Sequence, residues 1–247
     1  MQAFLLWFLP VFPLACGLLC QFLPCFEGAK ARNAFVTVAL AVNLALSVAL
    51  SCLGDGLLYL FSIGDALPLY LRTDGVGRLF LLLAAAMWLN SGCFSFGYIA
   101  HDQAPRRFYT FYLLTLGAIN GVCLAGTLVT MYLFFEMMTL LSLEMVLHNL
   151  TKEAVAAGVK YLLYSIAGAM MGLLGIFFLT HYSAQPVFAP GGTLVADAPP
   201  ATLLWVLVVT VIGFGTRAGM FPMHGWLPTA HPIAPAPGSA LLSGVIT

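Results

Sequence analysis

Long runs of apolar residues, separated by short polar segments, extend from one end of the chain to the other. Each run covers about 20 residues, which is the length of a helix that crosses a bilayer. The runs predict transmembrane helices at Ala3–Pro24, Ala34–Leu53, Leu79–Ala100, Phe108–Leu124, Thr127–His148, Ala154–His181 and Ala201–Pro222. A further run, Ala234–Thr247, is too short to span and ends with the chain. The pattern therefore predicts an all-α fold, a polytopic transmembrane helix bundle of about seven helices plus a partial eighth.

The polar segments between the runs predict how the helices connect. The segment 54–77 mixes Gly, Asp, Pro and short apolar pieces, so we expect an outer loop or a small hairpin packed on the helices. Gln185–Pro200, rich in Pro, Gly and Ala, is a second expected outer loop. Gly126 marks a tight turn, so the fourth and fifth helices should pack antiparallel. Thr151 is the expected N-cap of the sixth helix.

Composition supports a membrane protein and excludes other classes. Of 247 residues, 62% are hydrophobic and 7% are charged, whereas a soluble domain carries about 25% charged residues. The net charge is zero and no basic cluster is present, so a nucleic acid is not an expected ligand. The six cysteines lie inside apolar runs without the paired spacing of metal sites, so they are expected to be small buried hydrophobes. The first 26 residues lack a basic start, which favours a first transmembrane helix over a removed signal peptide.

The distribution of charged residues predicts the orientation. If the amino terminus lies outside, the cytoplasmic loops hold the basic residues Lys30, Arg32, Arg106, Arg107 and Lys152. The outer loops then hold Asp55, Asp65, Asp74 and Asp197, against the two basic residues Arg72 and Arg78. Cytoplasmic loops are enriched in Lys and Arg, so this orientation is the expected one.

Four charged residues lie within the predicted spans: Glu136, Glu144, Lys160 and Arg217. Each costs about 2.5–3.5 kcal/mol on insertion scales, so such residues usually have a function. At about 1.5 Å per residue, Glu136 lies about 20 Å from the inner end of its helix, Glu144 about 9 Å and Lys160 about 13 Å. We therefore expect Glu136 and Lys160 to interact across neighbouring helices. Glu144 and Lys160 have an alternative, because both are near enough to the interface to reach water, and Glu144 can also meet His148.

The segment 213–247 predicts a broken helix. An apolar helix reaches Arg217 and is followed by five prolines, at Pro222, Pro228, Pro232, Pro235 and Pro237. Proline removes backbone donors, and irregular backbone at membrane depth is tolerated where it is buried in protein or lines a wet cavity. We expect the break near 217–237, with Arg217 facing the protein interior and a carboxylate, carbonyl cluster or water within its reach. His224 and His231 either relay protons or bond to freed carbonyls.

This last segment resembles the signature of the antiporter-like subunits of respiratory complex I (the L, M and N type of NADH-quinone oxidoreductase). Related subunits occur in membrane-bound hydrogenases, formate hydrogenlyases and multisubunit cation/proton antiporters. The matching residues are Arg217, Ala218, Phe221, Pro222, His224, Trp226, Leu227, Pro228, His231, Pro232, Ser239, Ala240 and Leu241. YLFFEMMTLLS resembles the family's glutamate helix and puts Glu136 at the channel carboxylate. KYLLYSIAG similarly matches at Lys160, and TDGVGRLF, from Thr73, resembles the opening of the third helix.

The resemblance implies a proton-translocating channel subunit of a redox-driven membrane complex, with Glu136, Lys160, Arg217 and His224 as site residues. It implies no flavin, metal or quinone site in the chain itself, because redox work belongs to partner subunits. It also implies a multi-pass protein in the plasma (inner) membrane of a prokaryote. Two alternatives stay open: a subunit of a multisubunit sodium/proton antiporter, or a non-conducting structural subunit.

Three departures from the family pattern bear on these expectations. Arg217 stands where the family usually has Lys, so it is expected to act as a fixed charge, since Arg keeps its proton. Thr229 replaces the usual Asp. The expected domains are 1–100, with the first three helices and the outer loop, and 101–247, a first half-channel bundle truncated relative to the family. Either the chain is a fragment, or a second chain supplies the other half-channel beside the remaining membrane subunits.

Overall fold

The computed structural model describes residues 1–64, 67–189, 192–195 and 199–247. Its helices are α1 (Gln2–Phe22), η1 (Pro24–Phe26), α2 (Ala29–Cys52), α3 (Gly75–Tyr98), η2 (Ile99–His101), α4 (Pro105–Cys123), α5 (Leu128–Leu147), α6 (Lys152–His181), α7 (Pro200–Gly215), α8 (Leu227–Ala230), α9 (Ala236–Leu241) and the π-helical turn η3 (Leu242–Ile246). Two strands, β1 (Gly56–Ile63) and β2 (Leu67–Thr73), form an antiparallel hairpin. Asp65 and Asp197, which the orientation argument places in outer loops, lie outside the described residues.

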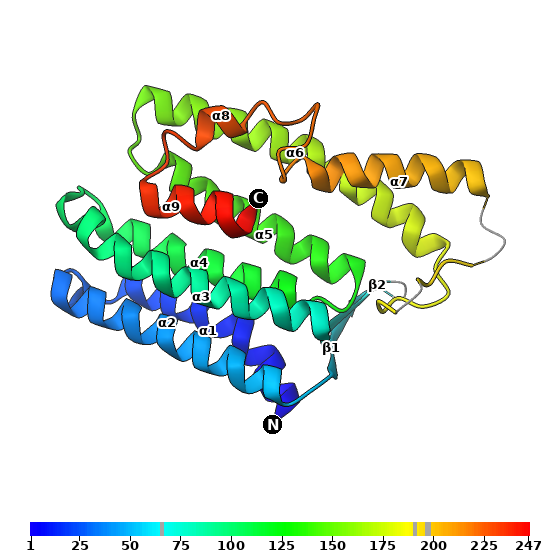
Figure 1. Cartoon of the computed structure of the whole chain (residues 1–247), viewed down its shortest axis with the longest axis horizontal. Helices are drawn as coiled ribbons and strands as arrows, with labels where there is room; N and C mark the ends of the chain where they lie inside the picture. Colours follow the sequence, from blue (N-terminus) through cyan, green and yellow to red (C-terminus); the bar gives the residue numbers. More distant parts are fainter. Residues whose placement is uncertain (65–66, 190–191, 196–198) are drawn as a thin grey trace.

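The long helices lie side by side along one axis (Figure 1). Helices α1 to α4 form one group, α6 and α7 form a second, and α5 lies between them with α9 alongside. The hairpin closes one end of the bundle, where the amino terminus also lies. Five segments among the described residues are long and apolar enough to cross a membrane: α1, α2, Gly75–His101, α5 and α6. The expected all-α multi-pass bundle is confirmed.

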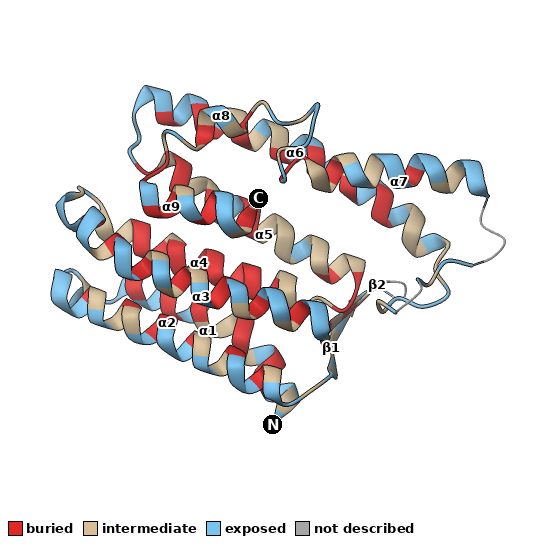
Figure 2. Cartoon of the chain, viewed as in Figure 1, coloured by how far each residue is buried: buried red, intermediate tan, exposed pale blue. Residues whose placement is uncertain are grey.

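Helix α4 is less apolar than the others because it is the centre of the first group. It packs against α1, α3 and α5, and all its residues from Phe108 to Gly121 are buried except Phe111, which is half-buried (Figure 2). A helix covered on all sides by protein does not have to match lipid. It can therefore carry the polar residues that link it to its neighbours.

Buried polar groups join α4 to the surrounding helices. The Asn120 side-chain amide donates to Asn43 Oδ1 on α2 at 2.8 Å and to the Leu9 carbonyl on α1 at 3.0 Å. The Trp88 indole of α3 donates to the Tyr112 carbonyl at 2.9 Å, and the Tyr112 hydroxyl donates to the Trp88 carbonyl at 2.6 Å. Such bonds hold helices together where lipid offers no hydrophobic driving force between them.

The connections follow the local sequence signals. Asp74, Thr127 and Thr151 cap α3, α5 and α6, each accepting a hydrogen bond from the backbone N–H three residues on. Thr151 was the cap expected from the sequence. The backbone N–H of Gly126 donates to the Tyr70 carbonyl of β2 at 2.8 Å, so the turn between α4 and α5 is fixed to the hairpin.

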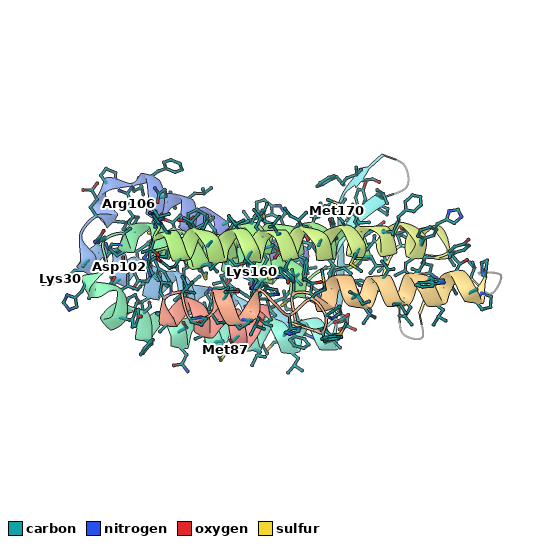
Figure 3. The ribbon with its side chains drawn as sticks, turned by 90° about the horizontal axis from the view of Figure 1, so that it is seen from above. Lys30, Met87, Asp102, Arg106, Lys160 and Met170 are labelled. Atoms are coloured by element: carbon teal, nitrogen blue, oxygen red, sulfur yellow. The ribbon has the colours of Figure 1, made fainter. Side chains whose placement is uncertain are left out.

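The expected basic residues gather at the end of the bundle away from the hairpin, where Lys30, Asp102 and Arg106 lie (Figure 3). The expectation that Arg32 lies in a cytoplasmic loop was wrong. It lies in the first turn of α2 and is 5% exposed, with its guanidinium over the Tyr109 ring and one N–H donating to the Glu27 carbonyl at 3.2 Å. Its long side chain folds inward to carbonyl and aromatic partners.

Candidate functional site

The site is built around the point where α7 ends. The helix stops at Gly215, before its predicted end at Pro222 and just before the break expected at 217–237, and helical structure resumes at Leu227 in α8. The turn between them passes through Gly219, whose φ of +65° favours glycine. A Cβ added there would also lie 2.5 Å from the end of the Leu227 side chain, which would have to shift.

Trp226 supports the broken segment. Its indole N–H donates at 2.8 Å to the carbonyl of Thr216, one of the carbonyls at the end of α7. The ring is 1% exposed and meets the Tyr161 ring edge-on, with centroids 5.0 Å apart. The tryptophan therefore bonds a free carbonyl at the end of α7 on one side and positions Tyr161 on the other.

Arg217 follows the helix end and points into the protein. The residue is 4% exposed, as expected for a charge that faces the interior. Its guanidinium donates to the Tyr161 hydroxyl and, at 3.4 Å, to Ser142 Oγ. The guanidinium carbon lies 5.1 Å from the centre of the Tyr161 ring and 5.7 Å from that of Phe135. Tyr161 and Ser142 also share a hydrogen bond of 2.7 Å. The expected partners were a carboxylate, carbonyls or water, and the structure instead supplies two hydroxyls and two aromatic faces.

Glu136 lies on α5, half-buried, one residue after the Phe135 that Arg217 covers. Glu136 Oε1 and Arg217 Nε are both buried without a hydrogen-bond partner among the described residues. Unpaired polar atoms in an interior are costly, and they are a recurrent mark of functional sites.

The expected ion pair between Glu136 and Lys160 is not formed. Neither residue takes part in an ion pair within the described part of the chain. Lys160 lies midway along the bundle and is half-buried (Figure 3). Tyr161, the next residue, is the one that contacts α5 through Ser142. Successive helical residues point about 100° apart, so with Tyr161 toward α5 the lysine faces another direction.

The remaining candidates have separate positions. His224 is exposed in the broken segment, with its ring 5.8 Å from that of Phe221. His231 contacts hydroxyls, with Nδ1 at 3.2 Å from Ser239 Oγ and 3.1 Å from Ser243 Oγ. Its carbonyl accepts from Ser239, so the histidine joins the broken segment to α9 and η3.

Glu144 forms an ion pair with Arg107 of α4 at 2.9 Å. This partner differs from both alternatives derived from the sequence, which were His148 and water.

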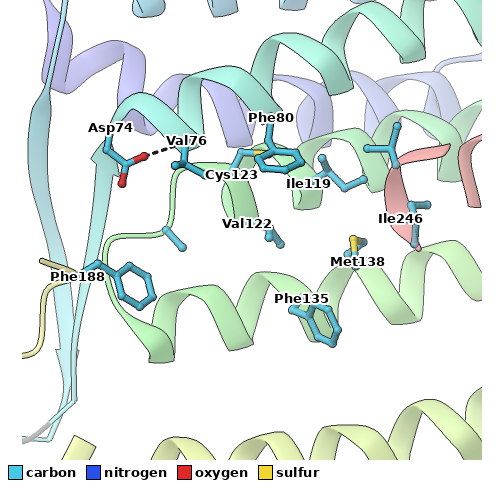
Figure 4. A pocket seen from close by; sticks show the side chains of 13 residues that line it. Asp74, Val76, Phe80, Ile119, Val122, Cys123, Phe135, Met138, Phe188 and Ile246 are labelled. Carbon is cyan, nitrogen blue, oxygen red and sulfur yellow. Dashed lines mark hydrogen bonds between the residues drawn. The ribbon is translucent and has the colours of Figure 1, made fainter. Parts of the chain in front are cut away.

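An apolar cavity of about 340 Å³ lies beside the site (Figure 4). It is bounded by α3, α4, α5 and η3, and Phe135 is one of its lining residues, along with Phe80, Met138 and Ile246. Asp74 at its rim is already bound as the cap of α3, accepting from the Gly77 N–H at 2.7 Å. The polar groups of the site therefore lie on the side of Phe135 that faces Arg217, and the cavity lies on the other side.

The sequence did not single out Ser142 and Tyr161, and it gave Trp226 only as one of the matching signature residues, without a role in the site. Tyr161 follows Lys160 in KYLLY, and Trp226 lies inside the WLP motif, so both were in segments of interest. A hydroxyl on an apolar helix gives no sign of which neighbour it meets, and only the packing of α5, α6 and the α7 end brings the three together.

Comparison with known proteins gives matches over both halves of the chain. Residues 125–247 match the family model described as NADH:quinone oxidoreductase/Mrp antiporter, transmembrane. An uncharacterised protein of Mycobacterium tuberculosis is 33% identical over 209 residues, covering 81% of this chain and 32% of that protein. A protein of Methylacidiphilum infernorum named hydrogenase-4 component F homolog is 30% identical over 210 residues, covering 77% of this chain and 44% of that protein.

The fold also matches a solved structure. The membrane-bound sulfane sulfur reductase, an archaeal respiratory membrane complex, contains a chain that superposes with a TM-score of 0.82 at 19% identity. The match covers all of this chain and 51% of the other. The chain therefore spans about a third to a half of the length of the proteins that it matches.

Proposed function

Because this chain belongs to the NADH:quinone oxidoreductase/Mrp antiporter family of membrane subunits, we propose that it is a proton-translocating channel subunit of a redox-driven membrane complex. The observation that carries the proposal is the buried Arg217 at a broken helix, over the ring of Phe135, which directly precedes Glu136 on α5. Broken helices next to ionisable groups recur where ions cross membranes.

Each residue has a distinct task in this proposal. Glu136 carries the proton in this proposal, because a carboxylate can bind and release one. Arg217 keeps its charge and sets the local potential, which also opposes the passage of other cations. The Tyr161 and Ser142 hydroxyls hold the guanidinium in place. Lys160 and His224 serve as relay groups at other depths of the pathway.

The direct test is Glu136→Gln in the native complex, assayed as redox- or gradient-driven proton movement in membrane vesicles. We expect proton movement to fall at least about tenfold, with normal assembly, because glutamine has similar size and cannot carry the proton. Glu153→Gln is the matched control, since Glu153 is exposed at the start of α6. Near-normal proton movement in Glu136→Gln at normal expression contradicts the proposal. If that variant fails to assemble, Glu136→Asp, which keeps the carboxyl group, must restore assembly and part of the proton movement.

A sodium/proton antiporter subunit is the second candidate, because the matching family includes Mrp antiporters. A non-conducting subunit is the third, because Arg217 cannot relay a proton. Purifying the native complex separates the first two. Iron–sulfur or nickel–iron companion chains support the redox complex, and a set of small antiporter subunits supports the other. The Glu136→Gln assay decides the third.

We further propose that the chain works beside other membrane subunits in the bilayer of a prokaryotic plasma membrane, with the amino terminus outside. The second half-channel then comes from a homologous bundle, either in the same polypeptide or in a separate chain. Identification of the chains in the purified complex tests this.

A further inference from the structure

A polar cleft of about 580 Å³ opens at the basic end of the bundle, between the connection from α3 to α4 and that from α5 to α6. Its lining includes His101, Asp102, Arg107, His148 and Thr151. The transport residues described above do not include any of these side chains. Asp102 and Arg106 mark this end of the molecule in Figure 3.

His148 is the buried group of the cleft. It follows the last residue of α5, and its side chain is 1% exposed. Its ring packs edge-on against Phe108, with centroids 5.6 Å apart. Nε2 lies 3.0 Å from Asp102 Oδ1, yet the geometry is not that of a hydrogen bond, so this nitrogen has no hydrogen-bond partner among the described residues. A buried ring nitrogen thus faces a carboxylate oxygen across the cleft without a hydrogen bond between them.

Asp102 places a negative charge beside Nε2 of His148. Burial raises the pKa of its carboxyl, but the Ala104 backbone N–H and the neighbouring His148 bring that pKa below its ordinary value. Asp102 is therefore ionised near neutral pH, and its side chain, 22% exposed, remains open to the cleft.

Arg107 connects the histidine to the membrane interior. One N–H of its guanidinium donates to the His148 carbonyl, and its Nε lies 2.9 Å from Glu144 Oε1. His148 and Glu144 are four residues apart on α5 and so lie on one face, about 6 Å apart along the axis. Glu136 lies a further two turns inward, about 12 Å from Glu144. Glu144, the acidic member of the ion pair, thus lies between the cleft and Glu136.

We propose that this cleft is the proton-uptake site of the subunit, in which the Asp102–His148 pair binds a proton from solvent and Glu144 receives it on the way to Glu136. The inference rests on the proposed function. In the uptake step, an O–H bond of solvent breaks and an N–H bond forms on the imidazole. That proton then moves to the Glu144 carboxylate, and the imidazole returns to its neutral form. Arg107 keeps its proton throughout and fixes the position of Glu144.

The charges around His148 favour the movement of a proton from solvent into the cleft. Asp102 faces the His148 ring from the loop before α4, while Arg107 of α4 contacts the His148 carbonyl and pairs with Glu144. The first residues of α6, Lys152 and Glu153, are exposed to solvent. One fixed cation between two carboxylates leaves a net negative site, which draws protons to the cleft.

The experiment measures the rate of proton movement by the native complex while the pH is varied on the side of the membrane that the cleft faces. It compares the unmodified chain with His148→Gln, Asp102→Asn and Glu136→Gln. His181→Gln is the matched control, because His181 is an exposed histidine at the far end of α6. Loss of the uptake site makes proton supply limiting, so we expect His148→Gln and Asp102→Asn to lose about tenfold in rate at alkaline pH and much less at acid pH. His181→Gln should keep the unmodified profile.

Each result has one interpretation. If Glu136→Gln loses proton movement while both cleft variants keep the unmodified pH profile, the uptake site is wrong and the proposed function stands. If a cleft variant loses the same fraction of its rate at every pH, its role is structural and the inference also fails. If Glu136→Gln moves protons normally, the proposed function fails and the uptake site with it. Should His148→Gln not assemble, Asp102→Asn decides alone, since it preserves size and the packing of the imidazole.

Discussion

Arg217 keeps a charge in a position where most of its contacts are hydroxyl groups and aromatic faces. A cation held in this way is fixed in direction, because the Tyr161 and Ser142 hydroxyls are themselves bonded at 2.7 Å. Lysine at the same position would reach fewer partners, since it lacks the planar fork of donors, and it can lose its proton when desolvated. Arg217 is therefore expected to act as a fixed electrostatic gate and not as a proton relay.

The substitution Arg217→Lys tests that distinction. We expect proton movement to become dependent on pH, falling or turning leaky as the lysine loses its proton at alkaline pH. The measurement is the rate of proton movement across a pH series, with Arg217→Ala as the variant that removes the charge altogether. A lysine variant with an unchanged or faster rate at every pH indicates a relay. An alanine variant with unchanged assembly, rate and pH dependence shows that the residue has no role in the channel.

Tyr161→Phe tests how the arginine is held. The change removes a hydroxyl that accepts from Arg217 and bonds to Ser142. We expect the free energy of unfolding to fall by about 1–2 kcal/mol, as for a buried hydrogen bond to a charged group. Tyr164→Phe is the matched control on the same helix, because no hydrogen bond of the Tyr164 hydroxyl is found among the described residues. Equal unfolding midpoints for the two variants in detergent contradict the assigned contact.

Glycine allows the elements around the site to approach closely. A Cβ added at Gly213 of α7 would lie 2.5 Å from the backbone nitrogen of Gly172 and 2.8 Å from the Gly168 carbonyl, both on α6. Backbone atoms of a packed helix cannot move aside as a flexible side chain can. The close contact of α6 and α7 therefore fixes where α7 ends and where Arg217 begins to turn inward.

Gly213→Ala should separate these helices. We expect a loss of about 1–3 kcal/mol in unfolding free energy, as for overpacking in a core, together with slower proton movement. Gly97→Ala is the control, since a Cβ at that helical position has no atom within 4 Å. Alanine improves helix propensity equally at both sites, so the difference in their detergent unfolding midpoints reports the packing. Equal midpoints contradict the close approach.

Elements were more predictable than their contacts. The apolar runs predicted the sixth helix as Ala154–His181 against the observed Lys152–His181, whereas the seventh, predicted to extend to Pro222, ends at Gly215. The direction of a side chain around its helix was not predictable in the same way. Depth along the axis suggested that Glu136 would meet Lys160, but the packing of α5 and α6 turns Tyr161 toward α5. The hydroxyl partners of Arg217 depend on three separate elements, so no local pattern in the sequence could indicate them.

At the scale of the whole molecule, the two ends of the bundle differ. The hairpin and the amino terminus lie at one end, where the Gln2 side-chain amide donates at 3.1 Å to the carbonyl of Gly54, just before β1. The basic residues and the proposed uptake cleft lie at the other (Figure 3). Basic residues favour the cytoplasmic side, so the hairpin end is expected outside.

Two native cysteines test this orientation. Contrary to the expectation that all six cysteines are buried, Cys52 is exposed at the hairpin end of α2, and Cys25 is exposed at the opposite end, in η1. In variants that keep one of the two, we expect a membrane-impermeant thiol reagent to label Cys52 from outside intact cells and Cys25 only from the cytoplasmic side of inverted vesicles. Buried Cys20 serves as the unreactive control. Labelling from the opposite sides reverses the orientation and puts the uptake cleft outside.

The most direct test of the central claim is the protonation state of Glu136 while protons move. Difference infrared spectroscopy of the native complex during turnover reports carboxyl groups that gain or lose a proton. We predict a carboxyl band that changes with turnover, disappears in Glu136→Gln and persists in Glu153→Gln. A turnover-dependent carboxyl band that survives in Glu136→Gln, or proton movement without any such band, contradicts the assignment of Glu136 as the proton carrier of this subunit.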